Sequence, residues 1–261
     1  MALRNEGLEE EILSNRAFTK CNFPKDWISD QKKKLSQPPM DKKGSGAHLT
    51  IKGDFESILK TNSYFQLLED RQSERVYTDQ SLSQQQLAFM LWSAQGVKYT
   101  RNEYASMRPV PSGGARHPFE LYFTVQENGV EGLEPGIYHY LPFENVGSKD
   151  VAIEYLGPLE NYEEQVKGML VGQKWAAKAP VTLFLSCVAY RAEWRYSILA
   201  HRVLLIDLGH VGQNIMLSAS AMGLGSCCIA AFDAEKCDDV LDLDGVEEYT
   251  VYAVPFGYVK E

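Results

Sequence analysis

The sequence has few of the residues that mark secreted, membrane or metal-binding proteins. Its five cysteines, at positions 21, 187, 227, 228 and 237, show no repeated Cys-x-x-Cys spacing. The five histidines show no ligand spacing either, so no metal site is expected. An odd number of cysteines fits reduced thiols in a cytoplasmic protein. We expect neither a signal peptide nor a membrane span, because no apolar run has the required length and position.

A surplus of basic charge is also absent. The 26 Lys and Arg residues are outnumbered by 35 Asp and Glu, which gives a net charge of −9. This balance argues against nucleic-acid binding but leaves room for one local cationic pocket for a small anion. The Gly-x-Ser-x-Gly elbow, the P-loop and the Rossmann glycine motif are all missing. With 44% hydrophobic residues, the 261-residue chain is expected to be globular with a large core.

The chain divides into two parts by composition. Residues 1–60 contain prolines at 24, 38 and 39 and two lysine runs. They are predicted to form an extended N-terminal arm with short helices near 8–16 and 55–61 and a solvated lysine-rich surface. Residues 61–261 are predicted to form one compact domain.

The pattern of this domain predicts an α+β fold with a mostly antiparallel sheet covered by helices. Apolar runs predict strands at 120–126, 136–141, 151–156, 180–188 and 249–254, and the continuous run 180–188 is expected at the centre of the sheet. Helices are predicted at 83–96, with Ser83 as N-cap and Gly96 as its end, and at 161–173, 198–222 and 234–241. Because helix 198–222 is apolar on nearly every face, it is expected to be buried on all sides.

Three segments contain residues suited to holding a ligand. If the segment Arg71-Gln-Ser73-Glu-Arg75 is extended, it turns two guanidiniums and one hydroxyl to the same side, which suits a phosphate. The small residues of 111–118 leave backbone N–H groups open to a ligand. The alternative for residues 71–75 is a solvated surface segment, and the alternative for residues 111–118 is a plain loop before the next strand. Gly223 is predicted to cap the long helix, and the turn 223–226, at the negative end of that helix, suits a neutral ring edge.

In this order and at these distances, the segments resemble the nitroreductase superfamily of FMN enzymes. Within it, the resemblance is greatest to the branch of SagB-like and thiazoline/oxazoline dehydrogenases. It covers about residues 61–261 and, more weakly, the segment Asn15–Thr19. The matching motifs are Arg71-x-Ser73-x-Arg75, Leu91-Trp-x-Ala-x-Gly96, Pro111-Ser-x-Gly-x-Arg116, Gly136-x-Tyr-x-Tyr140, Asp207-x-Gly-His-x3-Asn214 and Gly223-Leu-Gly-Ser226.

The resemblance implies a homodimer with FMN at the subunit interface, where the long helix 198–222 is expected to be buried against its two-fold mate. The residues implied to hold the FMN phosphate and ribityl chain are Arg71, Ser73 and Arg75, with Lys260 as a further phosphate contact. The residues implied to line the flavin, in this family often from the partner subunit, are Pro111, Ser112, Gly113 and Gly114. Near the isoalloxazine ring the resemblance implies Gly225 and Ser226, and from the long helix Gln213. Ping-pong hydride transfer through flavin N5 is the implied reaction.

One departure from the branch concerns the pair that precedes the long helix. The branch has Lys-Tyr there, whereas this sequence has Arg195-Tyr196. Arginine stays protonated and is no general base, so the resemblance leaves proton movement to Tyr196. Arg195 would then bind an anionic substrate or pair with Glu193.

Three functions are therefore compared. The first is a SagB-like dehydrogenase acting on a small molecule or a peptide. The second is a generalist nitro or quinone reductase with NAD(P)H as electron donor. The third is a flavin-binding or degenerate scaffold without enzyme activity, against which the intact Arg-x-Ser-x-Arg and Ser-Gly-Gly segments argue.

Overall fold

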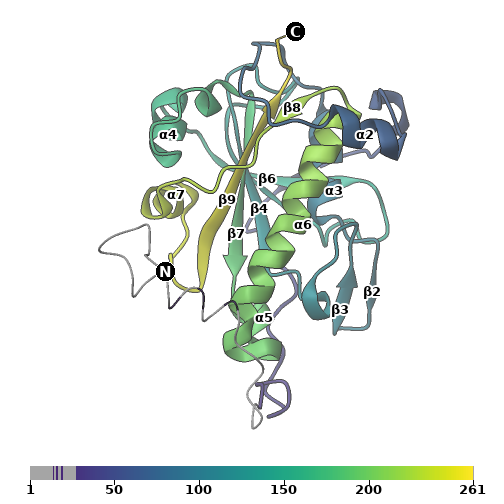
Figure 1. Ribbon diagram of the computed structural model, residues 1–261, viewed down its shortest axis with the longest axis vertical. Coiled ribbons are helices and arrows are strands. Elements are labelled where there is room, and N and C mark those ends of the chain that lie inside the picture. Colours follow the sequence, from purple (N-terminus) through teal and green to yellow (C-terminus); the bar gives the residue numbers. More distant parts are fainter. Residues whose placement is uncertain (1–13, 15, 17–18, 20–27, 261) are drawn as a thin grey trace, which may run out of the picture.

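A seven-stranded antiparallel sheet forms the centre of the computed structural model, which describes residues 14, 16, 19 and 28–260 (Figure 1). The strand order is β1-β6-β5-β4-β7-β9-β8. The strands are β1 His48–Ile51, β4 Phe119–Val125, β5 Gly136–Tyr140, β6 Val151–Gly157, β7 Val181–Val188, β8 Gly225–Ser226 and β9 Glu248–Gly257. All neighbouring strands pair antiparallel, so the predicted α+β fold is confirmed, with β7 central between β4 and β9.

Helices cover both faces of this sheet (Figure 1). Leu121 and Phe123 of β4 pack in one core cluster with α3 (Gln84–Gln95) and α6 (Ala200–Ala221). Tyr122, between them in sequence, packs in a second cluster with α4 (Tyr162–Met169) and α7 (Ala234–Leu241). Since successive side chains of a strand point to opposite faces, β4 is buried from both sides.

Local sequence signals explain where α3 begins and ends. The Ser83 side chain accepts a hydrogen bond from the Gln86 N–H, and the Gln86 side chain accepts one from the Ser83 N–H. This reciprocal pair is a capping box, which satisfies two N–H groups that the first turn leaves without partners. Gly96 is the C-terminal cap. Both predicted ends of this helix are confirmed.

Several smaller elements are additions to the predicted pattern. The helix expected at 55–61 is a single 3-10 turn, η1 (Glu56–Ile58), and the expected helix 161–173 already ends at Met169. The helix expected near 8–16 lies almost wholly outside the described residues. The elements that the pattern did not predict are β1, β8, α2 (Tyr64–Asp70), the hairpin β2 (Tyr99–Arg101) with β3 (Ala105–Met107), α5 (Tyr190–Tyr196), and the 3-10 turns η2 (Gly113–Ala115) and η3 (Ala176–Lys178). The 3-10 turn η4 (Ser197–Leu199) lies at the start of the predicted helix 198–222.

Part of the segment 1–60 is built into the fold. β1 pairs with β6 along its whole length, and Phe55 is buried in the core. Before β1, a buried ionic network holds the chain to the sheet. Arg191 forms an ion pair of 2.5 Å with Glu120 and donates a hydrogen bond of 3.0 Å to the Pro39 carbonyl oxygen. Part of the expected arm is therefore the edge strand β1, and the chain before this strand is held to the core through Arg191.

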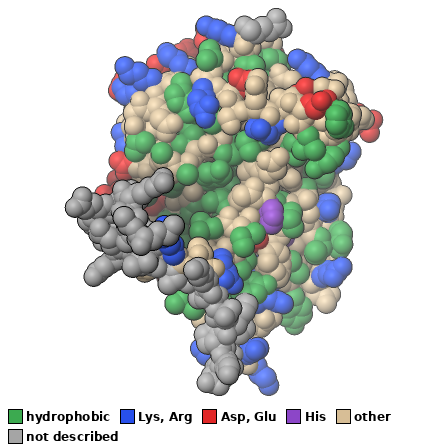
Figure 2. Space-filling model, viewed as in Figure 1, with side chains coloured by type: hydrophobic (Ala, Val, Ile, Leu, Met, Phe, Trp, Pro, Cys, Tyr) green, Lys and Arg blue, Asp and Glu red, His purple; other side chains and the backbone are tan. Residues whose placement is uncertain are grey.

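The long helix, which is expected to be buried and to lie at a homodimer interface, leaves one of its faces exposed in the single chain. The helix starts with η4 and continues as α6. Leu204, Leu208 and Ile215 are buried against the sheet, but Leu205 is 67% exposed and Ile206 55% exposed. Figure 2 shows hydrophobic side chains over this side of the molecule and in the hollow beside α6. Apolar side chains gathered on one exposed face of a helix are typical of interaction surfaces. Among the described residues, no helix is long and apolar enough to cross a membrane.

Candidate functional site

The loop before β4 is tied to α6 through one carboxylate. The Ser112 hydroxyl donates to Asp207 Oδ2 (2.7 Å), and the Gly113 N–H donates to both Asp207 oxygens (2.9 and 3.1 Å). The His117 N–H in turn donates to Ser112 Oγ (3.0 Å). Two of the groups expected to contact a flavin are thus bonded within the chain. The sequence reasoning did not include Asp207 among the site residues, although it begins the motif Asp207-x-Gly-His.

The same loop lies directly against the predicted catalytic pair. Gly114 has φ +61°, and a methyl group there would lie 2.6 Å from Arg195 Cδ and 2.7 Å from Tyr196 Oη. A methyl group on Gly113 would overlap Val203 of α6. Only glycine permits this backbone conformation and this approach together. The structure therefore brings Gly113 and Gly114 together with Arg195 and Tyr196, whereas Pro111, at the start of the loop, is exposed.

Backbone strain is concentrated around this junction. Ala115, His117 and Ser197 have positive φ values of 52°, 43° and 50°. Such conformations cost about 1–3 kcal/mol each and tend to occur at functional sites. Ser197 directly follows Tyr196 at the end of α5. Strained residues therefore occur both beside Tyr196 in the sequence and in the loop that packs against its side chain.

The charges near Tyr196 are positive. The Arg116 guanidinium lies 5.4 Å from the centre of the Trp194 ring and donates to the carbonyl oxygens of Gly114 (3.2 Å) and Tyr104. Burial and the nearby Arg195 lower the pKa of Arg116. The Arg195 guanidinium lies 5.7 Å from the Tyr196 ring centre.

The alternative in which Arg195 merely pairs with Glu193 is not observed. Glu193 pairs with His201 instead, at 2.7 Å. Within the part of the chain that the structure describes, Arg195 makes no ion pair. Among these residues its charge therefore has no ion-pair partner beside Tyr196, and a negatively charged group placed next to it would be stabilised.

The second predicted group lies at the other end of α6. A hollow of about 390 Å³ has Arg71, Ser226 and Leu224 among its lining residues. The Arg71 guanidinium makes no hydrogen bond or ion pair with any other described residue. Ser73 forms a bridge with Ser226, and the Glu74 N–H donates to the Ser226 carbonyl oxygen (3.0 Å). This pairing joins the Arg-x-Ser-x-Arg segment to the turn that follows α6.

Arg75 does not line this hollow with Arg71. Its guanidinium lies 5.6 Å from the centre of the Trp175 ring and donates to the Ser73 carbonyl oxygen (3.4 Å). Lys260 is exposed, and its N–H donates to the Val76 carbonyl oxygen (3.3 Å). The chain after β9 thus runs beside the segment that contains Arg75, and it places Lys260 on the same side of the fold.

Gly223 is the helix C-cap that the sequence predicts. It has φ +69°, and the Leu224 N–H donates to the Ala219 carbonyl oxygen (2.9 Å), as in a Schellman motif. A methyl group on Gly223 would overlap the Lys60 side chain, so the Lys60 ammonium lies at the negative end of α6. Lys60 lines the hollow with Arg71. No local pattern could have identified it, because only the fold brings it there.

Gly225 and Ser226 form the short strand β8 against β9. Both are buried, and a methyl group on Gly225 would overlap Val259. Gln213 is half-buried on α6, between the two groups. Asp207, which holds the loop, and Ala221, whose carbonyl oxygen accepts from the Lys60 N–H (2.8 Å), lie about 20 Å apart at 1.5 Å per residue. In one chain, the two groups are too far apart to contact one ring system together.

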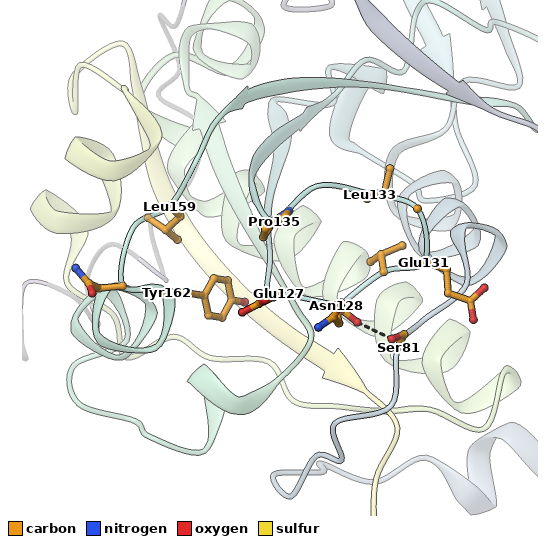
Figure 3. A pocket seen from close by; sticks show the side chains of 11 residues that line it. Ser81, Glu127, Asn128, Glu131, Leu133, Pro135, Leu159 and Tyr162 are labelled. Carbon is orange, nitrogen blue, oxygen red and sulfur yellow. Dashed lines mark hydrogen bonds between the residues drawn. The ribbon is translucent and has the colours of Figure 1, made fainter.

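A larger hollow of about 780 Å³ lies elsewhere, beside the loops that follow β4 and β6 (Figure 3). The Ser81 hydroxyl donates to the Asn128 carbonyl oxygen (2.6 Å), and the Tyr162 hydroxyl lies 3.2 Å from Thr124 Oγ1. Glu127 and Glu131 are its charged residues. It contains no cation and none of the predicted site residues, so it does not suit a phosphate.

Comparison with known proteins identifies the family. The nitroreductase family profile matches residues 68–258. The chain is 29% identical over 191 residues to MJ1384 of Methanocaldococcus jannaschii, a protein named as a nitroreductase, covering 73% of this chain and 88% of that protein. It is 30% identical over 151 residues to the trifolitoxin-processing protein TfxB of Rhizobium leguminosarum, covering 56% of this chain and only 39% of TfxB.

The fold agrees with this assignment. The Escherichia coli microcin synthetase complex McbBCD, solved with truncated pro-MccB17 bound, contains a chain with a TM-score of 0.61 at 20% identity, and the match covers 99% of each chain. This protein belongs to the nitroreductase family, a family of oxidoreductases. The expected resemblance to that superfamily, and within it to the SagB-like branch, is confirmed.

Proposed function

We propose that the protein is an FMN-dependent dehydrogenase of the SagB-like type that works as a homodimer. The observation that carries this proposal is the position of the two residue groups at opposite ends of α6, whose outer face is apolar and exposed. A two-fold axis across α6 pairs the helices antiparallel. The Ser112–Gly114 loop of one protomer then lies beside the Arg71 hollow of its partner, and one site is built from both.

The residues around the hollow fit the phosphate end of FMN. Arg71 makes no other hydrogen bond or ion pair in the described part of the chain, and Lys60 lies beside it. The two carboxylates that also line the hollow are hydrogen-bonded to amides: Asp70 accepts from Gln66 (2.7 Å) and Glu74 accepts from Gln72 (2.5 Å). The cations are thus left to an anionic ligand. Arg71 and Lys60 are therefore the proposed phosphate contacts. Ser73, Arg75 and Lys260 lie on the same side of the fold but do not line the hollow, so a role for them requires their side chains to turn towards the bound FMN.

Bound FMN would supply hydride transfer at N5, in the two half-reactions of a ping-pong cycle. In this scheme the Tyr196 hydroxyl holds or moves a proton, since Arg195 remains protonated. Arg195 and Arg116 attract a negatively charged part of the substrate or stabilise negative charge that develops on it. Gly225, Ser226 and Gln213 line the ring side of the cofactor.

A small molecule or a peptide is the proposed substrate. TfxB is named as a trifolitoxin-processing protein, and the McbBCD complex was solved with truncated pro-MccB17 bound. Both support a peptide substrate, although the match covers less than half of TfxB. A generalist reductase that takes electrons from NAD(P)H is the second candidate, and the 29% identity to MJ1384 supports it. In either case we place the protein in the cytoplasm, with residues 61–261 as the FMN-binding domain.

The first experiment is to record the visible spectrum of the purified protein and then add NAD(P)H without oxygen. Flavin absorption bands in protein purified from cells support the cofactor. Bleaching by NAD(P)H favours the generalist reductase, whereas a yellow protein that resists NAD(P)H favours a dehydrogenase reduced by its own substrate. A colourless protein that cannot be loaded with FMN contradicts the proposal and leaves the scaffold.

The Arg71→Gln variant tests the phosphate site directly. Loss of a charge-assisted hydrogen bond costs about 1.5–3 kcal/mol, so the Kd for FMN should rise roughly 10- to 100-fold. Arg101→Gln is the matched control, because Arg101 is an exposed arginine of β2 outside the hollow. Equal FMN affinity of the two variants would exclude Arg71 from the site.

A further inference from the structure

We propose that Asp207 is a positioning residue that holds the Ser112–Gly114 loop against Tyr196, and that the Ser112 hydroxyl and Gly113 N–H are anchors of this loop instead of cofactor contacts. The inference rests on the proposed function only in treating Tyr196 as part of the active site. It revises the roles that the family resemblance implies for Ser112 and Gly113.

The hydrogen bonds of Asp207 tie its carboxylate to the loop. Its carboxylate is 5% exposed and forms no ion pair with any described residue. A buried carboxylate without a cation must be compensated by hydrogen bonds. The three contacts that compensate it all come from Ser112 and Gly113, at 2.7–3.1 Å. Hence the carboxylate and the loop depend on each other.

The loop fits closely between α5 and α6. Val203, one helical turn before Asp207, fills the space against Gly113. The loop is thus held by packing on one turn of α6 and by hydrogen bonds on the next. Gly114 then touches the Arg195 and Tyr196 side chains so closely that a single added carbon would not fit. If the loop moved outward, the Tyr196 hydroxyl would lose its packing contact with Gly114.

The backbone that follows the anchoring residues Ser112 and Gly113 is strained. Ala115 and His117 keep positive φ values, which favour relaxation of the loop. The His117 N–H donates to Ser112 Oγ, whose own hydrogen goes to Asp207. A chain of two hydrogen bonds therefore runs from Asp207 to the strained residue, and Asp207 offsets the strain that would otherwise open the loop.

The experiment compares Asp207→Asn with Asp238→Asn by amide hydrogen exchange of the full chain. Asp238 is a matched control, since it is also a buried helix carboxylate that accepts from a backbone N–H, that of Thr250 (2.7 Å), but lies on α7 across the sheet. In Asp207→Asn, exchange at Gly113 and His117 should accelerate about tenfold or more, with Thr250 unchanged. Asp238→Asn should show the reverse pattern. Unchanged exchange at Gly113 in Asp207→Asn would overturn the proposal.

A second readout reports on Tyr196 itself. With 3-fluorotyrosine placed at position 196, the fluorine resonance should shift or broaden in Asp207→Asn and stay unchanged in Asp238→Asn. A resonance that does not respond while the loop amides exchange faster would show that the loop does not position Tyr196. If Asp207→Asn fails to fold, Ser112→Ala takes its place, with faster exchange expected at His117.

These measurements need no cofactor, so they separate the two proposals. A wild-type protein that binds no FMN contradicts the proposed function and leaves the exchange result intact. If FMN is bound, Ser112→Ala and Asp207→Asn should change its Kd to the same extent, within about threefold of each other, because both act only by releasing the loop. A loss in Ser112→Ala alone, as large as that expected for Arg71→Gln, would make Ser112 a cofactor contact and overturn this part of the inference.

Discussion

Gly114 and Arg195 are packed so closely that a methyl group on Gly114 would lie 2.6 Å from the Arg195 Cδ atom. Gly114→Ala is therefore expected to destabilise the fold in two ways, through its positive φ and through this overlap. Gly172→Ala is the matched control, because Gly172 has φ +84° and no atom within 4 Å of the added carbon. The control should lose about 1–2 kcal/mol from the backbone alone, and Gly114→Ala about 1–3 kcal/mol more. Urea denaturation measures both, and equal losses would contradict the close packing.

If the proposed homodimer forms across the exposed face of α6, Leu205→Glu and Ile206→Glu are expected to convert it into monomers. An unpaired carboxylate buried in the interface costs about 3 kcal/mol or more, which weakens association more than a hundredfold. Sedimentation equilibrium measures the change. Val246→Glu is the control, since Val246 is 75% exposed and follows α7 on another part of the surface. The proposed composite site fails if the Leu205→Glu protein remains dimeric.

The ion pair between Arg191 and Glu120 predicts non-additive stability changes. Both residues are buried, and Glu120 also lies 3.2 Å from His139. Although burial raises the pKa of Glu120, the charges of Arg191 and His139 outweigh it and lower that pKa to about 2. Arg191→Met leaves an uncompensated carboxylate and should cost about 3–5 kcal/mol. Adding Glu120→Gln should recover part of this loss in urea denaturation, whereas additive losses would show that the two residues act independently.

His117 predicts a pH dependence of stability. Burial, followed by the positive charge of Arg108, lowers its pKa from 6.5 to about 3. Between these values the unfolded chain binds more protons than the folded one, so the free energy of unfolding falls as the pH falls from 6.5 towards 3. His117→Asn, which suits the positive φ, should flatten this decline in thermal unfolding at a series of pH values. His48→Asn, at an exposed histidine of β1, should leave the slope unchanged.

The elements that sequence reasoning predicts are those with local signals. The run 180–188 is apolar throughout and becomes β7, and the Ser83–Gln86 pair marks the start of α3. By contrast, α2 is only seven residues long, which is shorter than the window in which a helical period can be recognised. The apolar composition of α6 predicted only that the helix is buried, and its expected place at a homodimer interface came from the family resemblance. Composition alone does not distinguish a helix that meets a second chain from one buried within its own chain.

The candidate site shows the same division. The loop 111–118 could be selected from its small residues, and the pair Arg195-Tyr196 from its position in the family resemblance. Their packing against each other, and the bond between Ser112 and Asp207, could not, because 95 residues separate that pair. Such contacts depend on how the tertiary fold brings distant segments of the chain together. The hydrophobic periodicity and motif spacing of the sequence do not contain that information.

The position of β9 has a consequence for how the protein is made. β9 lies between β7 and β8, although it follows β7 by about 60 residues. At roughly 5–20 residues per second, the ribosome needs about 3–12 seconds to deliver it after β7. During that time, the most apolar strand of the sheet has one free edge, which can pair with another chain. Losses during expression are therefore expected to come from the nascent chain, and slower synthesis or a chaperone should affect yield more than any change to the finished surface.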